Sequence, residues 1–282
     1  MAQSIEETDT APITQICEVL ELSRSAYYSW LDTEVTQRDE EDRILSPKVR
    51  EVFMHHRRRY GSRRIAMELS EKGSQCGRRK ASRIMKTQGL RAIQPKSFKP
   101  RSTESKHRLG YNPNLLLSES ANGIGQVWVC DITYIPCAEC HYCYLAVLMD
   151  AYSRRIVGWH LSENMTEELV LTALRNAITE RQPSPGLIHH TDRGGQYAAK
   201  EYRLILKRAS MRQSMSRADN SYDNAAMESC FGTIKNELEM TEYNTTNEAL
   251  KEVASYIEYY NVERRHSSLD YLSPVQFEST QR

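Results

Sequence analysis

Residues 127–134 read VWVCDITY, and residues 187–192 read LIHHTD. Both runs are short, apolar and rich in β-branched or aromatic residues, which is the pattern of buried strands. Each also contains an aspartate: Asp131 lies inside the first run and Asp192 ends the second. A carboxylate in a buried strand is costly unless it is paired or bound to a metal ion. These two runs therefore decide the fold and indicate a site that neutralises their charges.

The elements around these runs predict an α/β domain with a mixed sheet. Strand-like runs at 126–135, 141–150 and 154–162 follow one another through short turns, which favours an antiparallel meander. The expected order continues with a helix at 166–181, a strand at 187–192, a helix at 199–209, a strand at 212–216 and helices at 222–240 and 247–261. The first and fourth strands can then pair in parallel through a helical crossover. Because neighbouring strands lie ~4.8 Å apart, we expect Asp131 and Asp192 to share one site.

Glu228, in the helical stretch after Asp223-Asn224, is the third acid of interest. Taken singly, Asp192 could cap a turn and Glu228 could be an exposed helix residue. Together with Asp131 they are enough to hold the two divalent ions of a phosphoryl-transfer site, which lie ~3.5–4 Å apart. Mg²⁺ suits such a set because it takes few carboxylates and keeps several waters. Without metal, clustered carboxylates repel one another and their pKa values rise.

The net charge of +1 over 282 residues conceals a strong asymmetry. Residues 41–110 hold 20 Lys and Arg against 6 Asp and Glu, whereas the remainder holds 18 against 31. This division predicts one part that binds a polyanion and another that holds cations. The apolar run 144–149 is far too short to span a membrane, and the acidic N-terminus lacks a signal-peptide core. With an odd number of cysteines, the chain is expected to be cytoplasmic.

The basic segment predicts a helix-turn-helix, with helices at 44–56, 62–70 and 78–88. The third places apolar residues on one side and Arg79, Arg83 and Lys86 on another, as a DNA-recognition helix does. The alternative is a charged face exposed to solvent. The expected domains are a helical hairpin at 1–38 with Ser23 as an N-cap, the helix-turn-helix at 41–91, a basic linker at 92–125, the catalytic core at 126–240, and a C-terminal helix and tail at 241–282.

Three of the seven cysteines cluster as Cys137-Ala-Glu-Cys140-His-Tyr-Cys143. The spacing is similar to that of a zinc knuckle, but structural zinc sites need four ligands. No second half of such a site follows at usable spacing, so a strand hairpin is the favoured interpretation of this segment.

The residues around the three acids carry a specific resemblance. The motifs are Trp128-x-x-Asp131-Ile132-Thr133-Tyr134, His190-Thr191-Asp192-Arg193-Gly194-Gly195-Gln196-Tyr197 and Asp223-Asn224-Ala225-x-x-Glu228-Ser229-x-Phe231-x-x-x-Lys235-x-Glu237. They resemble the second-frame catalytic protein of insertion sequence three family transposases, and the 35 residues between Asp192 and Glu228 match the D,D(35)E signature. Tyr60-Gly61-x-Arg63-Arg64-Ile65 and Tyr260-Asn261-x-x-Arg264-x-His266 resemble the family's helix-turn-helix and C-terminal signature. Asp219 departs from the pattern, since members often have glycine there.

The resemblance implies an RNase H-like five-stranded core in which Asp131, Asp192 and Glu228 bind two Mg²⁺ or Mn²⁺ ions. We expect Lys235 to contact DNA near the scissile phosphate, or alternatively to pair with Glu239. Asn224 would orient Glu228 or support the start of its helix. Arg264 and Arg265 would hold a DNA end or dock the last helix onto the core. We expect Asp150 to pair with Arg154 or Arg155, and His190 to pack in the core.

The implied reaction cuts one strand at the end of an insertion sequence and joins the exposed 3′-hydroxyl to target DNA. The implied partners are terminal and target DNA, further copies of the chain on DNA, and an upstream-frame protein with which family members are fused by frameshifting. Two alternatives stay open: an RNase H-like nuclease or resolvase that cuts without joining, and a non-catalytic DNA-binding regulator.

Overall fold

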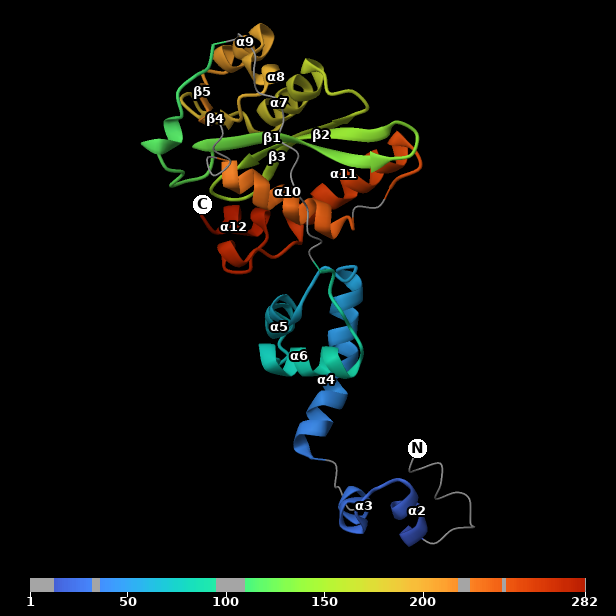
Figure 1. Ribbon diagram of the computed structural model, residues 1–282. Helices are drawn as coiled ribbons and strands as arrows, with labels where there is room; N and C mark the ends of the chain where they lie inside the picture. The colour runs from blue at the N-terminus through green and yellow to red at the C-terminus, as the bar shows by residue number, and fades with distance from the viewer. Residues whose placement is uncertain (1–12, 32–35, 95–109, 218–223, 240–241, 282) are drawn as a thin grey trace.

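The computed structural model describes residues 13–31, 36–94, 110–217, 224–239 and 242–281. Figure 1 shows three parts in chain order: an N-terminal helix pair, a helical domain and a larger α/β core that includes the C-terminus. The helix pair consists of α2 (Ile13–Val19) and α3 (Arg24–Leu31), and the Ser23 hydroxyl accepts the Ala26 N–H at the start of α3. The expected helices and the Ser23 cap are therefore confirmed. Within the described residues, no helix has the length and apolarity needed to cross a bilayer.

The helical domain packs three helices around one small core. They are α4 (Gln37–His55), α5 (Ser62–Glu71) and α6 (Arg78–Thr87), and their buried side chains form a single apolar cluster. α4 begins earlier than the sequence pattern predicts, because Thr36 and Asp39 form a capping box at its N-terminus. α6 ends as predicted just before Gly89, whose φ of +66° suits glycine at a helix C-terminus.

The core contains a five-stranded mixed sheet in the order β3-β2-β1-β4-β5. Its strands are β1 (Val127–Cys137), β2 (His141–Asp150), β3 (Ile156–Ser162), β4 (Ile188–Thr191) and β5 (Arg212–Met215). β1, β2 and β3 form an antiparallel meander, while β1 pairs with β4 and β4 with β5 in parallel. The predicted strand set and the parallel pairing of the first and fourth strands are confirmed.

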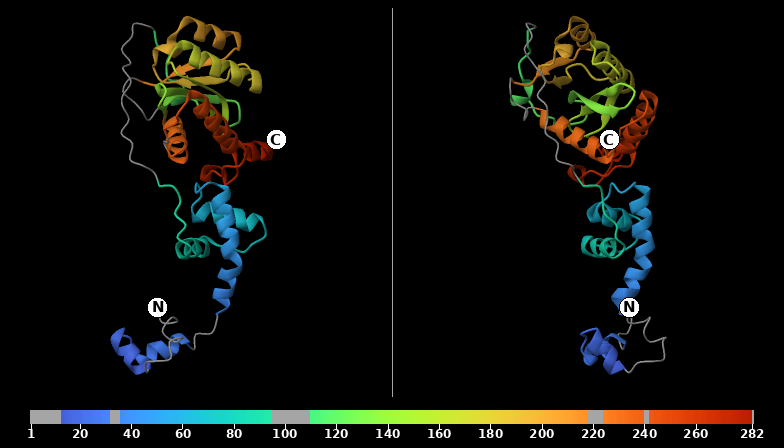
Figure 2. Two further views of the ribbon diagram at one scale, coloured as in Figure 1. Left: turned by 90° about the vertical axis from the view of Figure 1, so that its right-hand side faces the viewer. Right: turned by 45° about the vertical axis from the view of Figure 1, so that its right-hand side comes forward.

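Helices cover both faces of this sheet (Figures 1 and 2). On one face lie α7 (Glu167–Arg181), α8 (Gly195–Ala198) and α9 (Lys200–Arg208), and on the other lie α10 (Ala225–Glu237) and α11 (Thr246–Val262). β-strand alternation divides the buried side chains: Val129 and Val147 pack with α10 and α11, while Cys130 and Leu148 pack with α7. α7 lies so close to β3 that a Cβ at Gly158 would come within 2.5 Å of the Ala173 carbonyl oxygen.

Two segments that were predicted as irregular also pack on the core. Part of the expected linker contains a short helix, η1 (Leu115–Leu117), and lies along β5: the Leu115 N–H donates to Ser214 Oγ at 2.9 Å and Arg212 pairs with Glu119. The expected tail contains η3 (Ser267–Leu269) and α12 (Pro274–Thr280), the latter starting at a capping box formed by Ser273 and Gln276. Residues 110–125 are therefore continuous with the catalytic part, whereas 95–109 lie outside the described residues.

Candidate active site

The parallel pair β1 and β4 places the two strand aspartates side by side. Val129 is the register partner of His190. Continuing this register by two residues puts Asp131 opposite Asp192, which directly follows the last residue of β4. Ligand sites in sheets with parallel strands lie at such carboxyl ends. The short β4 ends there because Asp192 turns the chain into Gly194.

Asp131 carries the electrostatic signature of a shared carboxylate site. Burial, followed by the charge of Asp192 and then that of Glu228, raises the pKa of Asp131 to about 8. The Ile132 N–H and the charge of Lys235 act in the opposite direction and lower this pKa. The Ile132 N–H donates to Asp131 Oδ1 at 2.8 Å. Asp192 and Glu228 are thus both close enough to penalise a charge on Asp131. The predicted trio lies in one region of the molecule.

The conformation of Asp192 is set by the glycine turn that follows it. The Gly194 N–H donates to Asp192 Oδ1 at 2.9 Å, which is the turn-capping role considered for this residue. A Cβ at position 194 would lie 3.0 Å from the same oxygen. Glycine at 194 therefore lets the backbone N–H approach the Asp192 carboxylate without a steric clash.

Helix α10 presents Glu228 and Lys235 two turns apart on the side that meets β1. Glu228 is exposed in the first turn, and Lys235 is partly buried with its Nζ 4.1 Å from the centre of the Tyr134 ring. Burial lowers the pKa of Lys235, while Asp131 opposes the shift. Glu239 was the alternative partner expected for Lys235, and its Oε1 lies 4.0 Å from a guanidinium nitrogen of Arg58. Lys235 thus places a cation beside the carboxylates and the ring of Tyr134.

Asn224 stands at the start of α10, one turn before Glu228. Both polar atoms of its side chain are buried, and neither makes a hydrogen bond with the residues that the structure describes. It does not cap the helix with its side chain. A buried amide without partners is unfavourable, so this group marks a position where a ligand or water would add a contact. Asp219 lies outside the described residues.

The donor set fits hard divalent cations, which prefer carboxylate oxygens. The three carboxylates do not form one tight cluster, since within the described residues the groups of three ligand atoms within 4.8 Å are Cys137–Cys140–Cys143 and His55–His56–Glu263. Repulsion among like charges accounts for a spread arrangement with Glu228 exposed. Two ions ~3.5–4 Å apart bridge a wider set of ligands than one ion does. Asp131, Asp192 and Glu228 are therefore candidate ligands for such ions, spread more widely than the tight ligand groups found elsewhere in the described residues.

The neighbouring residues Asp150 and His190 play structural roles. The expected ion pair of Asp150 with Arg154 or Arg155 is wrong: its carboxylate accepts backbone N–H groups of Gly125, Tyr152 and Ser153. Arg155 instead pairs with Glu180 and Glu278. His190 is buried between the hydroxyls of Ser214 and Ser216, at 2.8 and 3.1 Å, which confirms that it packs in the core.

The basic residues of α6 differ in how they are held. Arg79 and Lys86 are exposed, whereas Arg83 forms two hydrogen bonds of 2.7 and 2.6 Å with Asp42 of α4. Lys80 forms an ion pair with Glu41, which also belongs to α4. A DNA contact by these residues stays a prediction. Of the three predicted contacts, Arg79 and Lys86 are exposed, as is Arg78 at the start of the helix.

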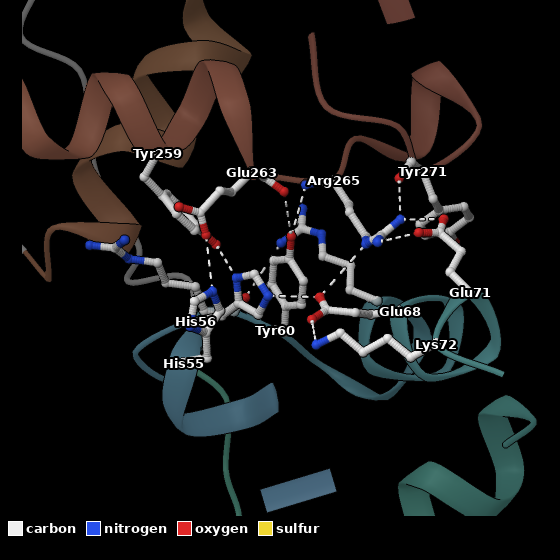
Figure 3. A network of polar contacts seen from close by, with 12 residues as sticks. His55, His56, Tyr60, Glu68, Glu71, Lys72, Tyr259, Glu263, Arg265 and Tyr271 are labelled. Carbon is white, nitrogen blue, oxygen red and sulfur yellow. Dashed lines mark hydrogen bonds and ion pairs between the residues drawn. The ribbon is translucent and has the colours of Figure 1, made fainter. Parts of the chain in front are cut away.

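Arg264 and Arg265 lie at the interface between the core and the helical domain. Arg264 is buried and donates to both carboxylate oxygens of Glu237 at 2.8–3.1 Å. Arg265 donates two hydrogen bonds of 2.6 Å to Glu71 of α5, and its backbone N–H donates to Tyr60 (Figure 3). Arg264 therefore makes the contact with the core that was one of its two expected roles, whereas Arg265 contacts the helical domain. Holding a DNA end stays a prediction for both.

The sequence reasoning missed most of this interface. His56 is buried between Glu68 at 2.7 Å and the Tyr259 hydroxyl at 3.0 Å, and the Tyr60 hydroxyl donates to the Glu263 carbonyl (Figure 3). Burial opposes the ionisation of Glu68, but hydrogen bonds from His56 and Lys72 outweigh it and lower the pKa to about 2. The available signal was the pair of motifs that contain Glu237 and Arg264, two residues that form an ion pair in the structure.

Comparison with known proteins follows the same division of the chain. Residues 121–221 and 209–274 match family models described as "Integrase core domain", and residues 39–98 match one described as "HTH-like domain". With the mixed five-stranded sheet and its three acids, these matches define an RNase H-like integrase core preceded by a helix-turn-helix-like domain. That class consists of polynucleotidyl transferases.

Close relatives specify the family. The chain is 42% identical over 265 residues to the "Insertion element IS600 uncharacterized 31 kDa protein" of Shigella sonnei, covering 93% of this chain and 97% of the relative. It is 38% identical over 272 residues to "Transposase InsF for insertion sequence IS3A" of Escherichia coli K12, covering 95% and 94%. A transposase of the element IS904 from Lactococcus lactis is 41% identical over 241 residues, covering 84% and 94%. The chain belongs to the IS3 family of transposases.

Proposed function

We propose that this transposase uses Asp131, Asp192 and Glu228 to hold two Mg²⁺ or Mn²⁺ ions, cuts one strand at the end of its insertion sequence, and joins the free 3′-hydroxyl to target DNA. Such ions, when bound, polarise the attacked phosphate and lower the pKa of the attacking water or hydroxyl. The chain's own residues supply the frame: β1 and β4 hold two carboxylates in register, and α10 carries the third.

The single observation that carries this proposal is the parallel pairing of β1 with β4, which brings Asp131 and Asp192 to neighbouring positions. The pKa of Asp131 is raised to about 8 by burial and by the charges of Asp192 and Glu228, which the Ile132 N–H and Lys235 only partly offset. A bound cation would explain why the fold brings three mutually repelling carboxylates into one region. The raised pKa also implies that ion binding releases protons at neutral pH.

Two further residues of α10 are assigned positioning roles. Lys235 lies within electrostatic reach of Asp131, which supports a role for its ammonium in contacting DNA close to the scissile phosphate. The buried amide of Asn224 would donate to Glu228 once that side chain turns inward, and so fix its orientation.

The proposed partners are the terminal and target DNA. The exposed Arg79 and Lys86 of α6 would contact the phosphate backbone at the element's ends, with Arg83 oriented by Asp42. The protein would act in the cytoplasm on DNA, as an oligomer assembled there and fused to the upstream-frame protein.

A strand-transfer assay with a pre-cut end tests the proposal. The protein is incubated with Mg²⁺, a labelled oligonucleotide that carries the element's terminal sequence with a free 3′-hydroxyl, and supercoiled target plasmid. Joined product is expected, and omission of Mg²⁺ or use of a 3′-deoxy end should remove it. Nicked plasmid without joining would favour a nuclease or resolvase, and binding without either product would favour a regulator.

A further inference from the structure

Three thiols meet at the tip of the β1–β2 hairpin, away from the carboxylates. Cys137 ends β1, Cys140 lies in the turn and Cys143 belongs to β2, and their sulfur atoms all lie within 4.8 Å of one another. Cys137 and Cys143 are fully buried, while Cys140 is partly exposed. Strand cleavage and joining make no use of them.

The spacing of the sulfurs matches that of ligands on one tetrahedral ion. With Zn–S bonds of ~2.3 Å, two sulfurs on the same zinc ion lie about 3.8 Å apart. The Sγ atoms of Cys140 and Cys143 are 3.6 Å apart. The hairpin brings this about because Cys137 pairs with His141 across the turn, which folds Cys140 back toward both strands. The other two sulfur pairs lie within 4.8 Å, so all three sulfurs are near the separation that one ion requires.

The surroundings of the thiols are polar on one side. The Thr246 hydroxyl, at the start of α11, lies 3.9 Å from Cys140 Sγ and 3.8 Å from Cys143 Sγ. It donates to Glu163 at 2.8 Å, and the Thr246 N–H donates to Glu139 at 3.0 Å. Burial opposes ionisation of Cys137, but hydrogen bonds from the backbone N–H groups of Cys140 and Glu139 outweigh it and leave its pKa below the usual value. Such N–H groups stabilise a metal-bound thiolate.

We propose that Cys137, Cys140 and Cys143 bind a soft divalent cation of the Zn²⁺ class as three thiolates, with solvent in the fourth position on the Thr246 side. The thiol protons leave to solvent as the ion binds. The predicted strand hairpin is confirmed. The proposal departs from the sequence argument only in requiring no second half-site, because three ligands would come from the hairpin and water would complete the set. Soft sulfur donors also separate this site from the carboxylate site, which takes hard cations.

The site would secure the segment between α10 and α11 to the sheet. Next to Cys137, the Ala138 N–H donates to the Tyr243 carbonyl at 2.8 Å, and the Tyr243 N–H donates to the Pro136 carbonyl at 3.2 Å. Thr246 adds its contact with the cysteines from the first turn of α11. An ion on the hairpin would therefore restrain the end of the helix that carries Glu228 and Lys235.

Metal analysis and Co²⁺ substitution of the full chain, purified reduced and without chelator, test the proposal. We expect one zinc per chain, and a thiolate-to-cobalt charge-transfer band when Co²⁺ replaces it. Cys140→Ser, the variant of the partly exposed ligand, should lose both signals while its circular dichroism stays unchanged. The control Cys76→Ala, at a buried cysteine of the helical domain, should keep them. Asp131→Asn should also keep them, because the carboxylates contribute no sulfur.

Two outcomes overturn the proposal. One is reduced wild-type protein that binds less than stoichiometric zinc and shows no thiolate-to-cobalt band, which would leave the cysteines as plain core residues. The other is a metal signal that survives in Cys140→Ser and in a folded Cys137→Ser variant. A Cys140–Cys143 disulfide that persists in the reduced preparation and excludes metal counts with the first outcome.

Discussion

Two acidic regions of this molecule are treated in opposite ways by the fold. At the domain interface, Glu237 is buried against Arg264, and Glu68 is buried against His56, Lys72 and Arg265. At the candidate active site, Asp131 faces Asp192 and Glu228, with Lys235 as the cation that acts on it. The pKa falls to about 2 for Glu68 and rises to about 8 for Asp131.

The opposite pKa shifts distinguish acids that stabilise the fold through ion pairs from acids that repel one another in the folded state. Where the fold supplies the counter-charge, the acid stabilises the folded state from within. Where it supplies further carboxylates, with Lys235 only partly offsetting them, the folded state bears a cost that a bound cation, as proposed, would remove. Helix α10 carries one acid of each kind, Glu228 in its first turn and Glu237 in its last, so the contrast can be tested on a single element.

The largest expected effect is on activity. Glu228→Gln should abolish strand transfer, with a loss well beyond the ~10–100-fold that removal of an outer partner of a metal ligand costs. Because Glu228 is exposed and repelled by Asp131, the free energy of unfolding should not fall. Strand-transfer yield and urea unfolding measure the two quantities. Residual transfer near the wild-type level would remove Glu228 from the site.

The matched change Glu237→Gln should do the reverse to stability. It leaves the buried Arg264 guanidinium without its carboxylate, which typically costs ~3–5 kcal/mol. We expect a lower midpoint in urea, with Glu228→Gln as the control on the same helix. If Glu237→Gln and Glu228→Gln unfold at the same urea concentration, the distinction between the two kinds of acid fails.

The pH dependence of unfolding should have opposite slopes from the two regions. The pKa of Asp131 is raised from 3.8 to about 8, so metal-free protein should lose stability as pH rises through this window, by on the order of 2 kcal/mol for a partly exposed group. The pKa of Glu68 is lowered from 4.5 to about 2, so its contribution should be present above that window and lost as pH falls through it.

Unfolding midpoints at several pH values, with and without Mg²⁺, measure both slopes. Asp131→Asn should flatten the change between about pH 4 and 8, and Glu68→Gln should flatten the acid limb. Mg²⁺ should reduce the first slope only. A slope above pH 4 that survives in Asp131→Asn would assign it to another group.

The smallest effect concerns the cations of α6. Arg79→Ala and Lys86→Ala should each weaken DNA binding and reduce the slope of log affinity against log salt by ~0.9 if each contacts one phosphate. Arg83→Ala should in addition lower stability slightly, because Asp42 loses its partner. Lys200→Ala, exposed on α9, is the control. Unchanged salt slopes in the α6 variants would point to a different DNA-binding face.

Periodic patterns in the sequence predicted the sheet well because its register follows directly from them. Alternation placed Asp131 and Asp192 on neighbouring strands, and the helical crossover required parallel pairing. The boundaries were less accurate where side chains decide them, as at Thr36, whose capping box starts α4 early. Residues 110–119 carry no periodicity, yet β5 binds them through backbone groups that no pattern reveals.

Contacts between distant segments were the least predictable part. Asp150 was expected to pair with an arginine nearby in sequence, but the turn after β2 supplies three backbone N–H groups first. For Arg264 and Arg265 the sequence left two roles open, because their partners Glu237 and Glu71 lie in other elements. The cysteine cluster was set aside because spacing along the chain cannot show how a hairpin tip closes.

The docked interface also fixes the orientation of the helical domain relative to the core. Tyr60 receives a hydrogen bond from the backbone of Arg265 and donates one to that of Glu263, so the helical domain cannot tilt without breaking contacts at the end of α11. A DNA end gripped by that domain would therefore reach the catalytic carboxylates at a constant offset, counted in base pairs. Relatives that cut at another offset are expected to have changed the residues of this junction rather than those of the catalytic centre.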